Sequence, residues 1–380
     1  MRRIFIRSKP VAACLCLSLL FMFFILRAVF PLAALQDPQV PESRSDAGNG
    51  ESFCHTNSSN DTIPPVELKE FVVNPHPFRY TICPRVVCLA NLTVIAMVHS
   101  APANFEKRKL IRETWGDYQY YKDASLRLLF VIGLPSETSM QKEILEESRV
   151  HQDILQEDFI DTYRNLTYKF TAVLKYVHTY CSHVPYMLKT DDDAFVNVFA
   201  MIKMVRALPS AKQQQLMLCQ ILPSNATRTN SSKWCVTREE WQLDYFPEPC
   251  AGGVVLVSND LFLPLYNESF FTPFLWLDDV FVTGILADKL GVKHIPLNDA
   301  IQYSIAHMRF AYRFGIEYEM KSLVCYDGSY PSKTSLWYQI LTLYSSDFKF
   351  YNETFLPILI LSILLLSLCS IVFVLYLVAD

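Results

Sequence analysis

The sequence predicts an α/β domain between residues 89 and 346, built on a mostly parallel β-sheet with helices on both faces. The first observation is that short runs rich in aliphatic and β-branched residues alternate with amphipathic helical patterns. The second is that the longest apolar runs lie outside this segment, at the two ends of the chain. What remains between them is long enough for one sizeable domain with a full core.

The expected elements alternate along the domain. The first strand, LTVIAMVHS at 92–100, is followed by the helical pattern FEKRKLIRETW at 105–115. The run PYMLKTDDD at 185–193 is a strand that ends in three carboxylates. The remaining elements are a strand at 126–133 and helices at 141–150, 165–181 and 195–208. This rhythm of strand, helix and strand indicates parallel strands joined by crossover helices.

Composition and charge exclude several classes of protein. With 51% hydrophobic, 19% charged and 13% aromatic residues and only 10 glycines, the chain is neither disordered nor collagen-like. Its net charge of -4 gives no basic field to hold a polyanion, so we expect no nucleic-acid partner.

The amino-terminal apolar run predicts a membrane anchor. Residues 10–26 carry no charge and follow four basic residues, which predicts an uncleaved signal-anchor helix at 10–30 with residues 1–9 in the cytosol. The alternative is a cleaved signal peptide, for which Ala33 and Ala34 offer only a weak cleavage site.

The carboxyl-terminal run, residues 355–378, is also uncharged and is long enough to cross roughly 30 Å of hydrocarbon. We expect a second transmembrane helix there. A lipid-anchor signal is the alternative, because the short residues Ser345, Ser346 and Asp347 precede the apolar tail. Two spans would make the protein membrane-embedded, with one large lumenal loop. The Pro- and Ser-rich stretch at 31–88 is its stem.

Two further patterns agree with a lumenal loop. The loop contains eight cysteines, an even number that suggests disulfides. Their spacing in the sequence does not reveal which cysteines pair. All glycosylation acceptor motifs lie between the two apolar segments, at Asn57, Asn60, Asn91, Asn165, Asn225, Asn230, Asn267 and Asn352.

The three carboxylates at 191–193 are the first candidate site. In an open α/β sheet, ligands bind at the carboxyl ends of the strands. Residues two apart on an extended segment point the same way, so Asp191 and Asp193 converge while Asp192 points elsewhere. Carboxylate oxygens select a hard cation such as Mg²⁺ or Mn²⁺. A solvated acidic turn or a helix cap is the alternative interpretation.

A second acidic pair, Asp278 and Asp279, precedes an apolar helical run. A helix amino-terminal cap explains one of these residues, whereas the second could serve as a general base. Gly252 and Gly253 open a predicted strand. Adjacent glycines allow a ligand or another chain segment close to the backbone, although a simple turn explains them equally well.

Six blocks in order carry a family resemblance: RKLIRETW (108–115), LLFVIG (128–133), DILQEDFIDTYRNLTYK (153–169), MLKTDDDAFVN (187–197), CAGGVVLVS (250–258) and LDDVFVTG (277–284). Over residues 92–307 the chain resembles the β-1,3-galactosyltransferases, a family of glycosyltransferase family 31 type that includes β-1,3-N-acetylglucosaminyltransferases. The resemblance implies a GT-A-like, Rossmann-like fold, a Golgi membrane location with a lumenal catalytic domain, and inverting transfer from a UDP-sugar.

The resemblance also implies roles for individual residues. It makes Asp193 the principal Mn²⁺ ligand, with Asp191 and Asp192 contacting metal or nucleotide, and Asp279 the catalytic base beside Asp278. A late histidine, best matched by His307 with His294 as a competitor, would be a further metal ligand. The remaining matches are Arg112, for nucleotide contact or packing, and Gly252 and Gly253 at the nucleotide.

The function that follows is transfer of galactose from UDP-galactose to a glycan on a glycoprotein or glycolipid. A UDP-N-acetylglucosamine donor is the alternative, since Asp278 stands where many galactosyltransferases carry Glu. A non-catalytic carbohydrate-binding protein is disfavoured, because Asp191, Asp193 and Asp279 would then be desolvated to no purpose. A metal-dependent phosphohydrolase is disfavoured by the absence of a phosphate loop.

Overall fold

The computed structural model describes residues 72–84, 88–121, 125–297, 305–306, 308–309, 324–325 and 329–344. His307, both predicted membrane segments (10–30 and 355–378) and most of the predicted stem lie outside these residues. Within the described ranges, no helix combines the length and the apolar character that a membrane span requires.

The framework is an eight-stranded sheet in the order β1-β4-β3-β2-β5-β8-β7-β9. Its four central strands, β4, β3, β2 and β5, are parallel. The bounds of the eight strands are β1 Tyr80–Ile82, β2 Leu92–His99, β3 Ser125–Leu134, β4 Ile154–Ile160, β5 Tyr186–Asp191, β7 Met217–Ile221, β8 Cys250–Ser258 and β9 His294–Pro296. The prediction of parallel strands is therefore right for the centre of the sheet.

The other half of the sheet is mixed. Strand β8 runs antiparallel to both β5 and β7, while β9 is parallel to β7. The chain passes from β7 to β8 through residues 222–249, which form no helix, and strands joined without a crossover helix pair in opposite directions. No strand was expected at 217–221, so the antiparallel pairs of β8 are a finding of the structure.

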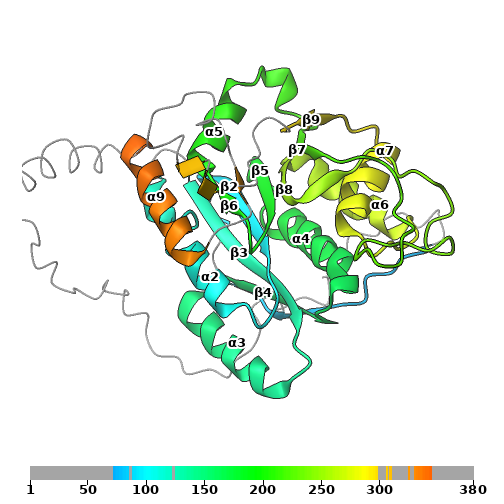
Figure 1. The fold of residues 1–380 in the computed structure, drawn as a ribbon, viewed down its shortest axis with the longest axis horizontal. Helices are drawn as coiled ribbons and strands as arrows, with labels where there is room; N and C mark the ends of the chain where they lie inside the picture. Colours follow the sequence, from blue (N-terminus) through cyan, green and yellow to red (C-terminus); the bar gives the residue numbers. More distant parts are fainter. Residues whose placement is uncertain are drawn as a thin grey trace, which may run out of the picture. The chain divides into compact units, whose positions relative to one another are not determined.

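Helices cover both faces of the sheet, as predicted. Figure 1 shows α2, α3 and α9 on one side and α4, α6 and α7 on the other. Helix α4 packs directly on β2, β3 and β4. The bounds are α2 Phe105–Arg112, α3 Thr138–His151, α4 Leu166–Tyr180, α5 Val198–Ala207, α6 Phe262–Phe270, α7 Ala287–Lys289 and α9 Tyr330–Tyr344.

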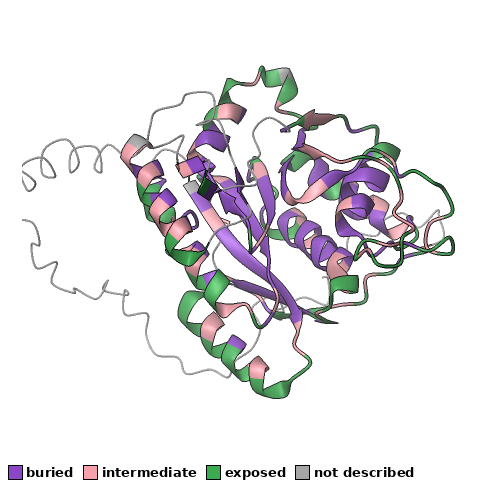
Figure 2. Ribbon diagram, in the orientation of Figure 1, coloured by how far each residue is buried: buried purple, intermediate pink, exposed green. Residues whose placement is uncertain are grey.

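The core lies between the central strands and these helices. In β2, Ile95, Ala96, Met97 and Val98 have no exposed surface, because the strand is covered on both faces (Figure 2). Each fully buried aliphatic side chain contributes about 1.5–3 kcal/mol. Two disulfides, Cys88–Cys181 and Cys219–Cys250, tie described elements together, whereas Cys235 carries a free thiol.

The domain begins earlier than the predicted boundary at residue 89. Strand β1 pairs antiparallel with β4. The backbone N–H groups of Val73 and Asn74 donate to the carbonyl oxygen of Phe270. A three-residue strand is too short to show a period in the sequence, so these residues were included in the predicted stem.

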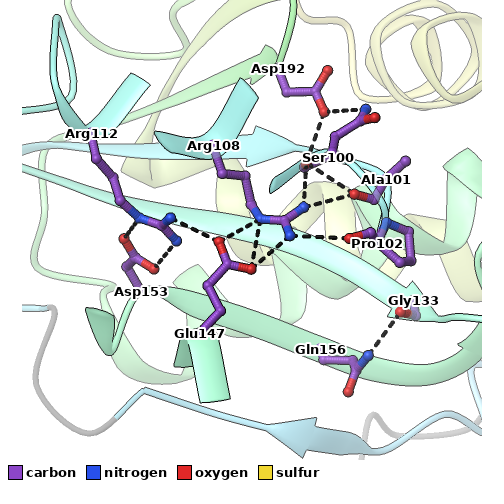
Figure 3. Close-up of polar contacts among 11 residues, drawn as sticks. Ser100, Ala101, Pro102, Arg108, Arg112, Gly133, Glu147, Asp153, Gln156 and Asp192 are labelled. Atoms are coloured by element: carbon purple, nitrogen blue, oxygen red, sulfur yellow. Dashed lines mark hydrogen bonds and ion pairs between the residues drawn. The ribbon is translucent and has the colours of Figure 1, made fainter. Parts of the chain in front are cut away.

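A buried ionic network fastens α2 to α3 and β4 (Figure 3). Arg108 is fully buried, and its Nη2 lies 2.6 Å from a carboxylate oxygen of Glu147. The same guanidinium donates to Ser100 Oγ at 3.1 Å and to the carbonyl oxygen of Ala101 at 2.8 Å. Arg108 thereby fixes the loop that follows β2.

We predict that Arg108→Met lowers the free energy of unfolding by about 3–5 kcal/mol, because it leaves the carbonyls of Ala101 and Pro102 without this buried donor and Glu147 with Arg112 as its remaining cation. Urea unfolding followed by tryptophan fluorescence measures the change. Arg149→Met is the control, because the Arg149–Glu146 pair is exposed on both sides and its loss should not be measurable. Equal stability of the two variants would contradict the prediction.

Candidate active site

The sheet brings the two predicted acidic groups to one edge. Strand β5 ends at Asp191 and its parallel neighbour β2 ends at His99, with these two residues in register. Strand β8 is antiparallel to β5, so its first half, with Gly252 and Gly253, lies at the same edge. Asp279 caps the π-helical segment η6 (Val280–Leu286) and lies against Gly252. Residues distant in sequence thus form one cluster.

Asp192 is the anchor of this cluster. Its buried carboxylate accepts hydrogen bonds from Ser100 Oγ, Asn104 Nδ2 and Lys107 Nζ, each at 2.8 Å. Its backbone N–H donates to the carbonyl oxygen of His99 at 3.0 Å. Asn104 precedes α2 but makes no side-chain cap bond there, since its amide serves Asp192. Asp192 therefore faces the loop after β2. Because β5 ends at Asp191 and the next two residues form a turn, the alternation of a strand does not extend to Asp192 and Asp193, and the convergence of Asp191 with Asp193 stays a prediction.

Asp191 and Asp193 are more accessible. The Asp191 side chain is 39% exposed, and its Oδ1 accepts from Lys189 Nζ at 2.9 Å. Burial raises the pKa of Asp191, while the Lys189 ammonium opposes that rise. Asp193 is exposed, and its backbone carbonyl accepts from Lys333 Nζ of α9 at 2.5 Å. These two carboxylates are the groups that face solvent.

Lys189 is the central cation, and it was not among the predicted site residues. Its buried ammonium lies 2.9 Å from Asp191 Oδ1 and 3.3 Å from Asp278 Oδ2, and it donates to the carbonyl oxygen of Gly252 at 2.5 Å. Burial alone would lower the pKa of Lys189, but the surrounding acids hold it above its usual value. One feature of the sequence could have identified it: a lysine in a strand expected to be buried needs a partner of opposite charge.

Asp278 is buried between two basic side chains. Its Oδ2 lies 3.3 Å from Lys189 Nζ and 3.6 Å from Nδ1 of His99. The His99 ring is buried with its centroid 5.7 Å from that of Phe170. Burial, with Lys189 and Lys169 nearby, lowers the pKa of His99 well below its usual value. The imidazole is therefore neutral, and Lys189 is the cation that balances Asp278.

Asp279 has the features of both a helix cap and a general base. Its Oδ1 accepts from the backbone N–H of Val280 at 2.8 Å, which makes it the cap of η6. Burial and then the charge of Asp278 raise the pKa of Asp279 to about 7, against the opposing effect of the Val280 bond and Lys189. A carboxylate with this pKa is suited to proton transfer near neutrality.

Gly252 lies in close contact with two other segments. A Cβ at this position would lie 3.2 Å from Lys189 Nζ and 3.3 Å from Asp279 Cβ. Gly253 presents its carbonyl to Thr190 Oγ1 at 2.8 Å. The glycine pair thus brings β8 against both the lysine and the capping acid.

The other predicted residues lie elsewhere. Arg112 contacts Glu147 at 2.8 Å and Asp153 at 2.7 Å, with its guanidinium 4.7 Å from the Phe130 ring centroid. Its position favours the packing role. His294 binds the carbonyl oxygen of Thr283 through Nε2 at 2.8 Å, which makes it a support for η6. Among the described residues, no three His, Cys, Asp or Glu side chains form a metal-binding group.

This fold and site define an α/β enzyme with clustered carboxylates at the carboxyl edge of its parallel strands. The family model described as Galactosyltransferase matches residues 106–298. The chain belongs to this galactosyltransferase family.

Two curated relatives illustrate the similarity. Beta-1,3-galactosyltransferase 1 of Mus musculus is 27% identical over 291 residues, which cover 76% of this chain and 89% of the relative. Lactosylceramide 1,3-N-acetyl-beta-D-glucosaminyltransferase of Rattus norvegicus is 31% identical over 242 residues, or 61% of this chain and 63% of the relative. A solved glycosyltransferase involved in glycosylation of the major capsid of PBCV-1 is 12% identical, covering 63% of this chain and 97% of that chain, with a TM-score of 0.35.

We predict that Asp279→Asn stabilises the protein at pH 8 but hardly changes it at pH 4. The pKa of Asp279 is raised by folding, so the wild type loses stability as pH rises from about 4 to about 7 and this group ionises. The neutral amide avoids that loss. Thermal unfolding midpoints at the two pH values measure the effect, which should reach several degrees at pH 8. Asp288→Asn, at an exposed position on α7, is the control and should show no pH-dependent gain.

Proposed function

We propose that this protein is a Golgi UDP-sugar-dependent inverting β-1,3-glycosyltransferase that transfers galactose from UDP-galactose to an acceptor glycan on a glycoprotein or glycolipid. Membership of the galactosyltransferase family supports a sugar transferase. The observation that carries the chemistry is the pairing of two accessible acids, Asp191 and Asp193, with a separate acid, Asp279, whose pKa is raised to about 7.

Asp279 is the proposed general base. The acceptor hydroxyl must lose its proton as it attacks the anomeric carbon of the donor sugar, and a carboxylate with a pKa near the working pH accepts that proton efficiently. One Asp279 oxygen is held by the Val280 N–H, which fixes the direction of the other. A single displacement with one base inverts the anomeric centre and needs no covalent intermediate.

Asp278 and Lys189 set the electrostatics around that base. The charge of Asp278 keeps the pKa of Asp279 high, and the ammonium of Lys189 limits the rise. Lys189 also spans Asp191 and Asp278, 2.9 and 3.3 Å away, so it links the donor side of the site to the base. Gly252 permits this approach because it has no side chain.

Asp191 and Asp193 are the proposed ligands of Mn²⁺ on the donor side, with His307 as a further proposed ligand. Two carboxylates suit a hard cation that takes its remaining ligands from phosphate oxygens and water. When bound, such an ion stabilises the negative charge that develops on the UDP leaving group. Lys333 holds the backbone carbonyl of Asp193 and thereby orients this acid.

The proposed setting is the Golgi membrane, with the catalytic domain in the lumen between segments 10–30 and 355–378. The two uncharged segments and the glycosylation motifs between them support this placement.

Galactose is the proposed donor sugar because the first relative, matched over 76% of this chain, is named a galactosyltransferase. N-acetylglucosamine is the second candidate, favoured by the name of the rat relative and by Asp278. Acceptor-dependent release of UDP, measured with each UDP-sugar in turn, tests the choice. Release with UDP-N-acetylglucosamine alone would reassign the donor.

Two substitutions should separate the donor side from the base. We expect Asp193→Asn to abolish transfer and weaken Mn²⁺-dependent UDP binding. Asp279→Asn should lower kcat at least a hundredfold and leave UDP binding intact, because a general base contributes about 10²–10⁴-fold. Turnover assays and UDP titration calorimetry measure these effects. Retained turnover in both variants would disprove the assigned roles.

Lys189→Met should move the acidic limb of the kcat/KM profile to higher pH. Lys189 opposes the rise in the pKa of Asp279, so its removal leaves the base with a still higher pKa. An upward shift of about one unit is expected for loss of a nearby opposite charge. The exposed Lys109 on α2 provides the matched control, Lys109→Met, whose profile should coincide with that of the wild type.

A further inference from the structure

Three aromatic side chains from separate parts of the chain meet beside the proposed base. Tyr163 belongs to the short helix η3 (Tyr163–Asn165), Trp234 to the segment between β7 and β8, and Trp276 to the turn before η6. The rings of Tyr163 and Trp276 are 5.9 Å apart between centroids. Lys233 connects the other pair, since its Nζ lies 4.6 Å from the Trp234 ring centroid and 6.0 Å from that of Tyr163.

Two of these rings face solvent, and the third is buried against Tyr163. Tyr163 is 47% exposed and Trp234 is 53% exposed, whereas Trp276 is 4% exposed. Exposed aromatic rings that are grouped and backed by a buried ring mark ligand-binding surfaces more often than isolated apolar residues do. We call Tyr163, Lys233 and Trp234 the aromatic platform.

The platform lies close to the acids of the site. Trp276 is three residues before Asp279 in the chain. Burial raises the pKa of Tyr163, and the charges that add to this rise come from Asp279, Asp278 and Asp191, while a hydrogen bond with Trp234 opposes it. The phenol therefore lies within the electrostatic reach of both the base and the donor-side acid, and it contacts Trp234.

The segment that carries Trp234 is held in place. Arg228 donates to the backbone carbonyls of Val236 and Trp241 at 2.9 and 2.8 Å. Glu240 accepts from the backbone N–H of Thr237 at 2.9 Å. An ion pair between Arg164, next to Tyr163, and Glu240 joins the two sides of the platform. The rings are thus preorganised, which lowers the entropy cost of binding.

We propose that the aromatic platform binds the sugar ring of the acceptor glycan, and this proposal rests on the proposed function. One face of a β-linked hexose presents C–H groups that pack on an aromatic ring, and its hydroxyl edge offers acceptors to an ammonium such as that of Lys233. The ring that docks here places a neighbouring hydroxyl toward Asp279. Trp234 and Tyr163 then determine which acceptors reach the base.

The test uses the full chain in detergent micelles, with lactose and benzyl β-N-acetylglucosaminide as acceptors. We expect Trp234→Ala to raise the KM for the acceptor about tenfold, the upper range for loss of one aromatic contact, while the KM for the UDP-sugar stays within about twofold. Trp234→Phe should restore most of the acceptor affinity. Tyr180→Ala, which removes an exposed tyrosine at the far end of α4, is the control and should leave both KM values unchanged.

An unchanged acceptor KM in Trp234→Ala would overturn the proposal. So would a raised KM for the UDP-sugar alone, because it would show that the platform stacks on the uracil of the donor. Saturation-transfer NMR of the same sugars with Asp279→Asn, in the presence of UDP and diamagnetic Mg²⁺, measures binding to the platform without turnover. If the wild type transfers no sugar, yet Asp279→Asn binds one and its Trp234→Ala derivative does not, the platform stands and the transferase function fails.

Discussion

A buried ammonium group holds the acidic site together. Lys189 lies on a strand that is covered on both faces, where an unpaired charge would be strongly destabilising. Its partners are two acids from different segments, Asp191 on its own strand and Asp278 before η6, together with the carbonyl of Gly252 on β8. Because each partner needs the same cation, the three segments are held in one arrangement.

The loop after β2 depends on a second set of buried polar contacts. Asp192 joins Ser100, Asn104 and Lys107, while Arg108 joins Ser100 to Glu147 on α3. Ser100 contacts both Asp192 and Arg108. The position of Asp192, directly after β5, is therefore connected to the packing of α2 against α3. The middle aspartate of the triplet is therefore an anchor, whereas Asp191 is partly exposed and Asp193 is exposed.

The raised pKa of Asp279 lowers the stability of the fold near neutral pH but suits proton transfer. Asp278 is buried and the adjacent Asp279 is half-buried. Lys189 is near both acids but also pairs with Asp191, so it offsets their charge only in part. This arrangement disfavours ionisation of Asp279, which costs stability near neutral pH, and the same effect brings its pKa to the range in which a base works. Its cap bond to Val280 supplies part of the compensation.

The sequence by itself determined the local features of this protein. The period of its apolar residues predicted three of the four central strands, β2, β3 and β5, and helices on both faces, and the order of its motifs predicted the family. It also predicted a strand that ends in carboxylates, and β5 does end at Asp191.

Tertiary structure alone decided which distant residues meet. The reversal of β8, the pairing of Lys189 with Asp278, the packing of Arg112 against Glu147, and the meeting of Tyr163 with Trp276 all join segments far apart in the chain. Local patterns carry the period and the residue type but not the register between segments. The pKa of Asp279 follows from the same cause, since burial and neighbouring charge exist only once those segments are packed.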